Sequence, residues 1–158
     1  MYKICFVKWK YHQFIQASNG SDGDLFGRSF DINEKTTVII SHNKKRGEVY
    51  AFTLQGETWT YNKKVTASDS TSGDNFETSV AISGDTLLVG SWVKDIRKGD
   101  IYVFVLAGGG SWNEGMRLYP RNVIASGDYF GSAVALSGDT SLIGSYGSNE
   151  KGVSSGAA

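Results

Sequence analysis

Three stretches of the chain share one pattern: Phe26–Ser41 (FGRSFDINEKTTVIIS), Phe76–Ser91 (FETSVAISGDTLLVGS) and Phe130–Ser145 (FGSAVALSGDTSLIGS). They align without gaps and begin 50 and 54 residues apart. A Gly-Asp pair stands just before each of them. Self-similarity at a fixed period is the mark of a repeat architecture, so this pattern decides the fold.

Each repeat is predicted to hold four β-strands. In the second repeat, Ser79–Ile82 alternates in polarity, Ser83–Asp85 favours a tight hairpin turn, and Thr86–Ser91 is a short buried run. β-branched and aromatic residues then fill Asp100–Ala107, and Trp112 opens a fourth strand. Four strands in each repeat of this length are typical of a propeller blade. No segment keeps a 3.6-residue period over a dozen residues, which excludes a helical solenoid.

Further segments recur in step with the first pattern. Gly47–Phe52 matches Gly99–Phe104, and Trp9–Ser18 matches Trp59–Ser68. Taken together, the Gly-Asp-x-Phe-Gly, Ser-Gly-Asp-Thr and Gly-x-x-Tyr-x-Phe elements resemble the FG-GAP repeat, over roughly residues 9–158. The resemblance implies a β-propeller like that of integrin α chains, in a secreted or cell-surface protein. The sequence departs from the family at Glu77, which stands where the family has glycine.

The repeat divides the chain into parts of blades within one propeller segment. We expect residues 1–18 to end one blade, with its third strand over Tyr2–Val7 and its fourth over Trp9–Ala17. We expect residues 22–67 and 72–124 to form two blades, and 128–158 to begin another. The fold class predicted is therefore all-β, an incomplete β-propeller of about three four-stranded antiparallel blades. Closed propellers need about 4–8 blades. We therefore expect the remaining blades to come from a longer chain or from self-association.

Composition excludes several classes of function. The 16 basic and 16 acidic residues give no net charge, which argues against a general nucleic-acid binder. A single cysteine excludes an internal disulfide framework and a CxxC site. No apolar run reaches the length of a membrane-spanning helix.

Strand direction predicts where a partner would bind. The 2–3 loops, between the second and third strands of a blade, and the interblade loops emerge at one end of the blades. Loops on a rigid scaffold commonly carry binding residues. The basic residues of the 2–3 loops are the candidates: Lys44, Lys45, Arg46, Lys94, Arg97 and Lys98. The alternative for each charge is a solvated polar loop.

Calcium is the cofactor that the resemblance raises, because related integrin repeats hold it in Asp-rich loops. The best candidates are Asp22 and Asp24, but no downstream acid completes a calcium loop. We therefore predict no metal site and no cofactor. Asp24, Asp74 and Asp128 are better explained as turn residues that accept backbone N–H groups.

No catalytic set can be assembled from the sequence. Residues 152–156 fit a G-x-S-x-G pattern, but only two alanines follow it, so no helix can complete a nucleophile elbow. The function predicted is a non-catalytic interaction scaffold, a fragment of a surface or secreted propeller protein that binds protein or glycan through the 2–3 and interblade loops. The alternatives are part of a propeller enzyme acting on glycans, or a non-functional gene fragment.

Overall fold

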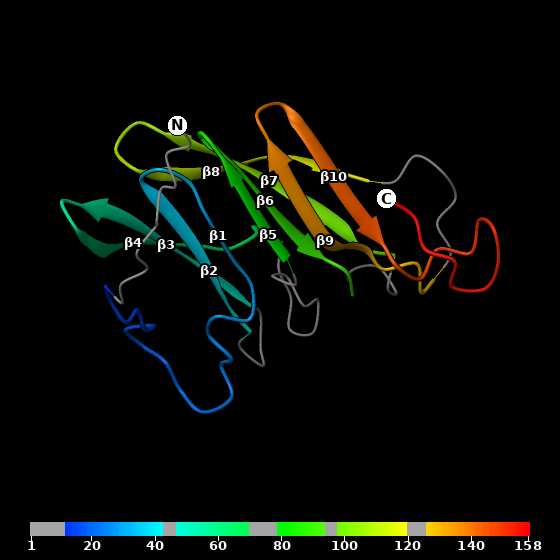
Figure 1. The fold of residues 1–158 in the computed structure, drawn as a ribbon, viewed down its shortest axis with the longest axis horizontal. Helices are drawn as coiled ribbons and strands as arrows, with labels where there is room; N and C mark the ends of the chain where they lie inside the picture. Colours follow the sequence, from blue (N-terminus) through cyan, green and yellow to red (C-terminus); the bar gives the residue numbers. More distant parts are fainter. Residues whose placement is uncertain (1–11, 43–46, 70–78, 94–97, 120–125) are drawn as a thin grey trace, which may run out of the picture.

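The computed structural model describes residues 12–42, 47–69, 79–93, 98–119 and 126–158. These residues contain β-strands and turns, with no helix among them, and the strands form three antiparallel sheets (Figure 1). The strands are β1 (Phe30–Ile32), β2 (Thr36–Ser41), β3 (Glu48–Gln55), β4 (Thr58–Val65), β5 (Ser79–Ser83), β6 (Thr86–Ser91), β7 (Asp100–Ala107), β8 (Ser111–Leu118), β9 (Phe130–Ser137) and β10 (Thr140–Ser145).

Each sheet corresponds to one repeat. The first blade has the strand order β1-β2-β3-β4, the second has β5-β6-β7-β8, and the third consists of β9 and β10. Every neighbouring pair is antiparallel and consecutive in the chain. This arrangement confirms the predicted fold class, an all-β incomplete propeller.

The strand register repeats from blade to blade. Ser41 lies opposite Glu48 in the first blade, and Ser91 lies opposite Asp100 in the second. In the third blade, Ser145 forms an antiparallel bridge with Ala157, with N···O distances of 2.8 and 3.0 Å. Ala157 therefore takes the position at which β3 and β7 begin.

The Gly-Asp-x-Phe-Gly element makes the same turn in the first and third copies. Leu25 and Tyr129 occupy its variable position, and both have positive φ, 48° and 56°. The glycine that follows the phenylalanine is also left-handed in both, at 92° for Gly27 and 83° for Gly131. A backbone of this kind favours glycine because it has no Cβ, which explains why the motif keeps glycine there.

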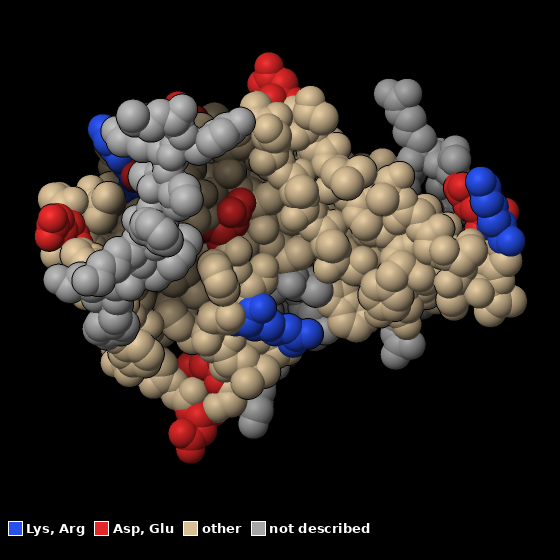
Figure 2. Space-filling view, in the orientation of Figure 1, with Lys and Arg blue, Asp and Glu red and all other residues tan. Residues whose placement is uncertain are grey.

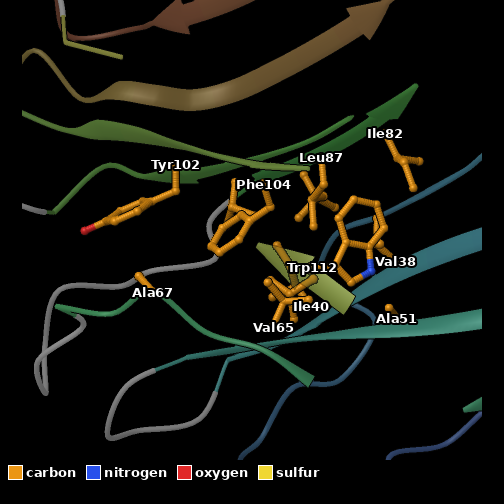
Figure 3. Close-up of a cluster of buried hydrophobic side chains, with 13 residues drawn as sticks. Val38, Ile40, Ala51, Val65, Ala67, Ile82, Leu87, Tyr102, Phe104 and Trp112 are labelled. Carbon is orange, nitrogen blue, oxygen red and sulfur yellow. The ribbon is translucent and has the colours of Figure 1, made fainter. Parts of the chain in front are cut away.

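The main core lies between the first and second blades. It joins Val38 and Ile40 of β2 to Leu87 of β6 and Phe104 of β7, and Trp112 of β8 closes it (Figure 3). Four of these five side chains are 0–1% exposed, and Trp112 is 8% exposed. Burying such side chains stabilises the fold by about 1.5–3 kcal/mol each. The stack of blades, more than any single sheet, is therefore the source of stability.

A smaller cluster covers the opposite face of the first blade. Ile15, Ala17 and Phe26 pack there against Tyr50 and Phe52. The ring of Phe26 meets that of Tyr50 edge-on, with 5.6 Å between the ring centres. The cluster is completed by Ile39 and Trp59.

The segment before this cluster differs from the expected strand. Trp9–Ala17 was expected to be a fourth strand, but its described part, residues 12–17, has no strand ladder. Instead the Gln13 side chain makes two hydrogen bonds to the backbone of Trp59. Its Nε2 donates to the Trp59 carbonyl oxygen at 3.0 Å, and its Oε1 accepts from the Trp59 nitrogen at 2.7 Å. A ladder needs a neighbouring strand, and the expected neighbour, Tyr2–Val7, lies outside the described residues. Even so, Ile15 and Ala17 stand where Val65 and Ala67 stand one repeat later.

The first repeat keeps its hairpin turn without the Ser-Gly-Asp sequence. Asn33 Oδ1 accepts hydrogen bonds from the backbone nitrogens of Lys35, at 3.2 Å, and Thr36, at 2.8 Å. This side-chain turn replaces the left-handed glycine that the other two hairpins use, Gly84 and Gly138, each with φ of 54°.

Candidate functional site

The described interblade loop of residues 18–29 lies at the end of the first blade opposite its β1–β2 hairpin turn. In Figure 1 the β1–β2 and β9–β10 hairpin turns lie toward the top, and the loop of residues 18–29 lies at the bottom. Of the six basic candidates, only Lys98 is among the described residues, and it is exposed. Its carbonyl oxygen accepts a hydrogen bond of 2.9 Å from Phe130 N, so its backbone is fixed to the third blade. Lys44, Lys45, Arg46, Lys94 and Arg97 lie outside the described residues.

A tyrosine fixes the interblade loop of the first blade. The Tyr50 hydroxyl lies 2.8 Å from Asn19 Oδ1 and 2.6 Å from Glu48 Oε2. Lys64 Nζ, on the neighbouring strand, donates to the other carboxylate oxygen of Glu48 at 2.6 Å. The Tyr50 hydroxyl therefore holds the loop residue Asn19 to β3. The Glu48 carboxylate, which also bonds this hydroxyl, is held in turn by Lys64.

The equivalent tyrosine does the same in the second blade. Tyr102 donates to Asp69 Oδ1 at 2.8 Å, and Asp69 lies 50 residues after Asn19. Arg117 takes the place of Lys64 opposite the tyrosine. Its Nη2 is 2.6 Å from Asp69 Oδ2, and its guanidinium lies 4.6 Å from the centre of the Tyr102 ring. A charge-assisted bond and a cation–π contact therefore both fix this interblade loop.

The ionisation of these groups follows from their surroundings. Burial and the hydrogen bond to the Glu48 carboxylate raise the pKa of Tyr50 above its usual value. Burial opposes the charge of Arg117, but the bond to Asp69 and the nearby Tyr102 hold its pKa above the usual value. Tyr50 therefore stays neutral and Arg117 stays charged near neutral pH. This favours a positioning role over proton transfer, because a general acid or base needs a pKa near the working pH.

Two serines repeat a second contact at this end. Ser41 Oγ donates to the carbonyl oxygen of Asp24 at 3.1 Å, and Ser145 Oγ donates to that of Asp128 at 2.7 Å. The Asp24 carboxylate accepts from Ser21 N at 2.6 Å, which confirms its predicted role as a turn residue. Asp74, the third aspartate of this set, lies outside the described residues.

The calcium candidates are not brought into a ligand set. Asp22 is exposed, and the Asp24 oxygen that accepts from Ser21 N also accepts from Ser21 Oγ at 2.9 Å. Within the described ranges, no three side chains among His, Cys, Asp and Glu are close enough together to hold a metal ion.

The opposite end of the blades carries a cleft of about 630 Å³ between the first and second blades. Glu34 and Asp85 are among its lining residues, and Trp112 lies at its apolar side. Asn33 Nδ2 donates a hydrogen bond of 3.0 Å to the carbonyl oxygen of Gly84, and this bond joins the β1–β2 and β5–β6 hairpin turns. Two carboxylates in one cleft are the arrangement that the alternative of a glycan-acting enzyme would use, but both are exposed here.

The G-x-S-x-G stretch is a loop rather than a nucleophile elbow. Asn149 Oδ1 accepts from Ser154 N at 2.6 Å, and Gly156 N donates to Ser148 O at 3.0 Å. The segment then joins β10 through Ala157. It is the 2–3 loop of the third blade.

The tyrosine networks were not predicted from the sequence. Their signal was present: Tyr50 and Tyr102 recur in the Gly-x-x-Tyr element, and Asn19 and Asp69 recur after Ala-Ser. Each tyrosine is more than 30 residues from its bonding partner in the chain, so only the tertiary structure shows that the two residues bond to each other.

Comparison with known proteins gives one family. Residues 59–104 and 112–158 match the FG-GAP repeat. No curated protein matches the chain. Among the described residues, no helix is long and apolar enough to cross a membrane.

Proposed function

Because the chain belongs to the FG-GAP repeat family, we propose that it is a non-catalytic interaction domain that binds a protein or glycan partner through its 2–3 and interblade loops. The family and the all-β propeller fold support an interaction role in general. The partner class and the surface used are our proposal.

The repeated tyrosine network is the observation that carries this proposal. Asn19 and Asp69 are each bonded at 2.8 Å to the tyrosine of the blade that follows. Binding loses less conformational entropy when the loops are already fixed. The end of the blades where these loops meet is therefore better suited to bind a partner than the exposed hairpin turns.

Charge gives the proposed surface its chemistry. Six basic residues belong to the 2–3 loops of the first two blades, with Lys98 exposed at the end of the second of these loops. The carboxylate of Asp69, in the interblade loop before the second blade, is already bonded to Arg117. We infer that the surface suits an acidic partner, such as a sulfated or carboxylated glycan or an acidic protein segment. A secreted or surface location is consistent with such partners.

The test is a binding comparison on a printed glycan array, with heparin as a soluble anionic probe. A variant with all six basic residues changed to serine should bind heparin at least about tenfold more weakly, because exposed charge pairs contribute about 0.2–1 kcal/mol each. Lys98→Ser alone should weaken binding, and Lys35→Ser should not, because Lys35 is also exposed but belongs to a hairpin turn at the opposite end.

Unchanged heparin and array binding by the six-fold variant would contradict the proposed surface. An equal loss in Lys35→Ser would also contradict it, because the effect would then follow total charge rather than place.

A further inference from the structure

The cleft of about 630 Å³ between the first and second blades begins where the main core ends. Val38 of β2 pairs with Ala51 of β3 inside the core. The next pair on the same face of the sheet, Thr36 and Thr53, lines the cleft. The wall of the first blade therefore changes from apolar to hydroxyl-bearing as it leaves the core. The volume lies within the range of about 300–1,000 Å³ that ligand sites have.

Trp112, on the second-blade wall of this cleft, presents a polar group that is open to a ligand. The residue is 8% exposed and packs in the main core. Figure 3 shows its indole nitrogen on the side of the ring that faces the first blade. Among the described residues none accepts a hydrogen bond from this nitrogen, yet the nitrogen is not sealed from solvent. Because a buried tryptophan usually finds a partner for its N–H group, this donor favours a ligand with an acceptor.

Asn62 of β4 adds an acceptor to the same cleft. Its Nδ2 donates to Thr53 Oγ1 at 3.1 Å, which fixes the side chain and leaves Oδ1 without a partner among the described residues. The side chain also reaches the second blade, since a Cβ added at Gly110 would lie 3.0 Å from Asn62 Nδ2. One blade thus supplies a donor and the other an acceptor, and Leu106 adds apolar surface.

The hairpin turns that border the cleft are fixed by their own bonds. In each blade, the turn after the first strand accepts a backbone hydrogen bond from the third strand, at 2.9 Å from Leu54 N and at 2.8 Å from Leu106 N. The bond between Asn33 and Gly84 joins the two turns. Binding therefore requires little ordering of the cleft, which leaves more of the contact energy for affinity.

The charged residues of the cleft are of both signs. Glu34, Lys35 and Asp85 line it and are exposed. Figure 2 shows acidic and basic side chains along the upper edge of the molecule, where Figure 1 places hairpin turns. An anion would meet two carboxylates and one ammonium group here. A neutral molecule that carries several hydroxyl groups suits this mixture better, because a hydroxyl both donates and accepts.

We propose that this cleft binds a neutral sugar residue of a glycan. One sugar hydroxyl accepts from the Trp112 indole nitrogen, another donates to Asn62 Oδ1, and the apolar face of the sugar ring lies against Leu106. The cleft is at the opposite end of the blades from the surface proposed for an acidic partner, so the two proposals are independent. Its lining residues all belong to the first and second blades, each of which has four strands.

The experiment is isothermal titration calorimetry of the 158-residue chain with glucose, galactose, mannose and N-acetylglucosamine, followed by the neutral glycans of the printed array. We expect saturable binding of at least one of these sugars. Asn62→Ala and Trp112→Phe should each weaken it by about fivefold or more, because each removes one hydrogen bond. Asn113→Ala is the matched control, since Asn113 is an exposed asparagine of β8 outside the cleft. Asn62 is exposed, so its variant should fold even if the core variant Trp112→Phe does not, and circular dichroism checks both.

Sugar binding by the parent chain and by Asn113→Ala, weakened in Asn62→Ala, supports the proposal. The absence of binding to all four sugars and to every neutral glycan overturns it. Equal binding by the parent and by Asn62→Ala also overturns it, because the sugar then lies elsewhere. The variant with six basic residues changed to serine should keep its sugar binding while it loses heparin binding. Loss of sugar binding in that variant alone would contradict the cleft, whereas unchanged heparin binding would contradict only the loop surface.

Discussion

Gly131 stands where the second and third blades approach closely, and its substitution by alanine tests the account of that junction. Its φ is 83°, and an added Cβ would lie 2.8 Å from Ile101 Cδ1 and 3.1 Å from the Asp100 carbonyl oxygen. Ile101 is 0% exposed, so it has little room to move away. Gly27 is the equivalent residue of the first blade, with φ of 92° and nothing within 4 Å of an added Cβ.

The two substitutions separate two costs. Alanine at positive φ costs about 1–2 kcal/mol at either position. Crowding in a packed interior adds about 1–3 kcal/mol, and only Gly131 is crowded. We therefore expect Gly27→Ala to lower the free energy of unfolding by about 1–2 kcal/mol and Gly131→Ala to lower it by about 2–5 kcal/mol.

Urea denaturation followed by tryptophan fluorescence measures both values. Equal losses of stability in the two variants would refute the close approach of the blades at Gly131. A larger loss for Gly27→Ala would refute it as well.

Three further predictions address the contacts between blades and one titrating group. Tyr102→Phe removes the hydroxyl that bonds Asp69 and should lower the free energy of unfolding by about 1 kcal/mol in urea denaturation; an unchanged midpoint would contradict the role given to this bond. Asn33→Ala removes both the turn acceptor and the bond to Gly84, so it should cost about 1–2 kcal/mol. Thermal unfolding measures this loss, and an unchanged melting temperature would oppose it. Burial and the positive charge of nearby Arg28 lower the pKa of His42 below 6.5. The contribution of His42 to stability should therefore be complete above pH 6.5 and fall as the pH drops below it, because the unfolded state then binds more protons. Titration by NMR should place its midpoint below 6.5, and a midpoint above that value would show the sign to be wrong.

The sequence predicted the strands well because the signals for them are local. Ser83–Asp85 and Gly108–Gly110 are turns that a few residues specify, and the runs between them alternate or are apolar over a strand length. The repeat added a check that a single blade lacks, since each element could be compared with its copies. The described part of Trp9–Ala17 departed from prediction because a strand needs a neighbour, and propensity alone does not supply one.

Only part of the candidate site could be predicted from the sequence. Antiparallel strand order predicts the end of the blades at which each loop emerges, but of the six basic residues only Lys98 is among the described residues. The bonds of Tyr50 to Asn19 and of Tyr102 to Asp69 could not be predicted. Each joins residues more than 30 positions apart, and their distance depends on how one blade packs against the next.

The sequence by itself therefore determined the family, the all-β architecture and the internal geometry of a blade, since these depend on short-range turns and on a repeat that is visible in the residues. Only the tertiary structure decided how much of each copy of the repeat is buried. Leu88 and Leu142 are the same residue at the same repeat position, yet one is 2% exposed and the other 61%. The difference comes from the blade that covers Leu88 and from the open face at Leu142. Burial is a property of the neighbours that a residue meets, and the stacking of blades sets those neighbours.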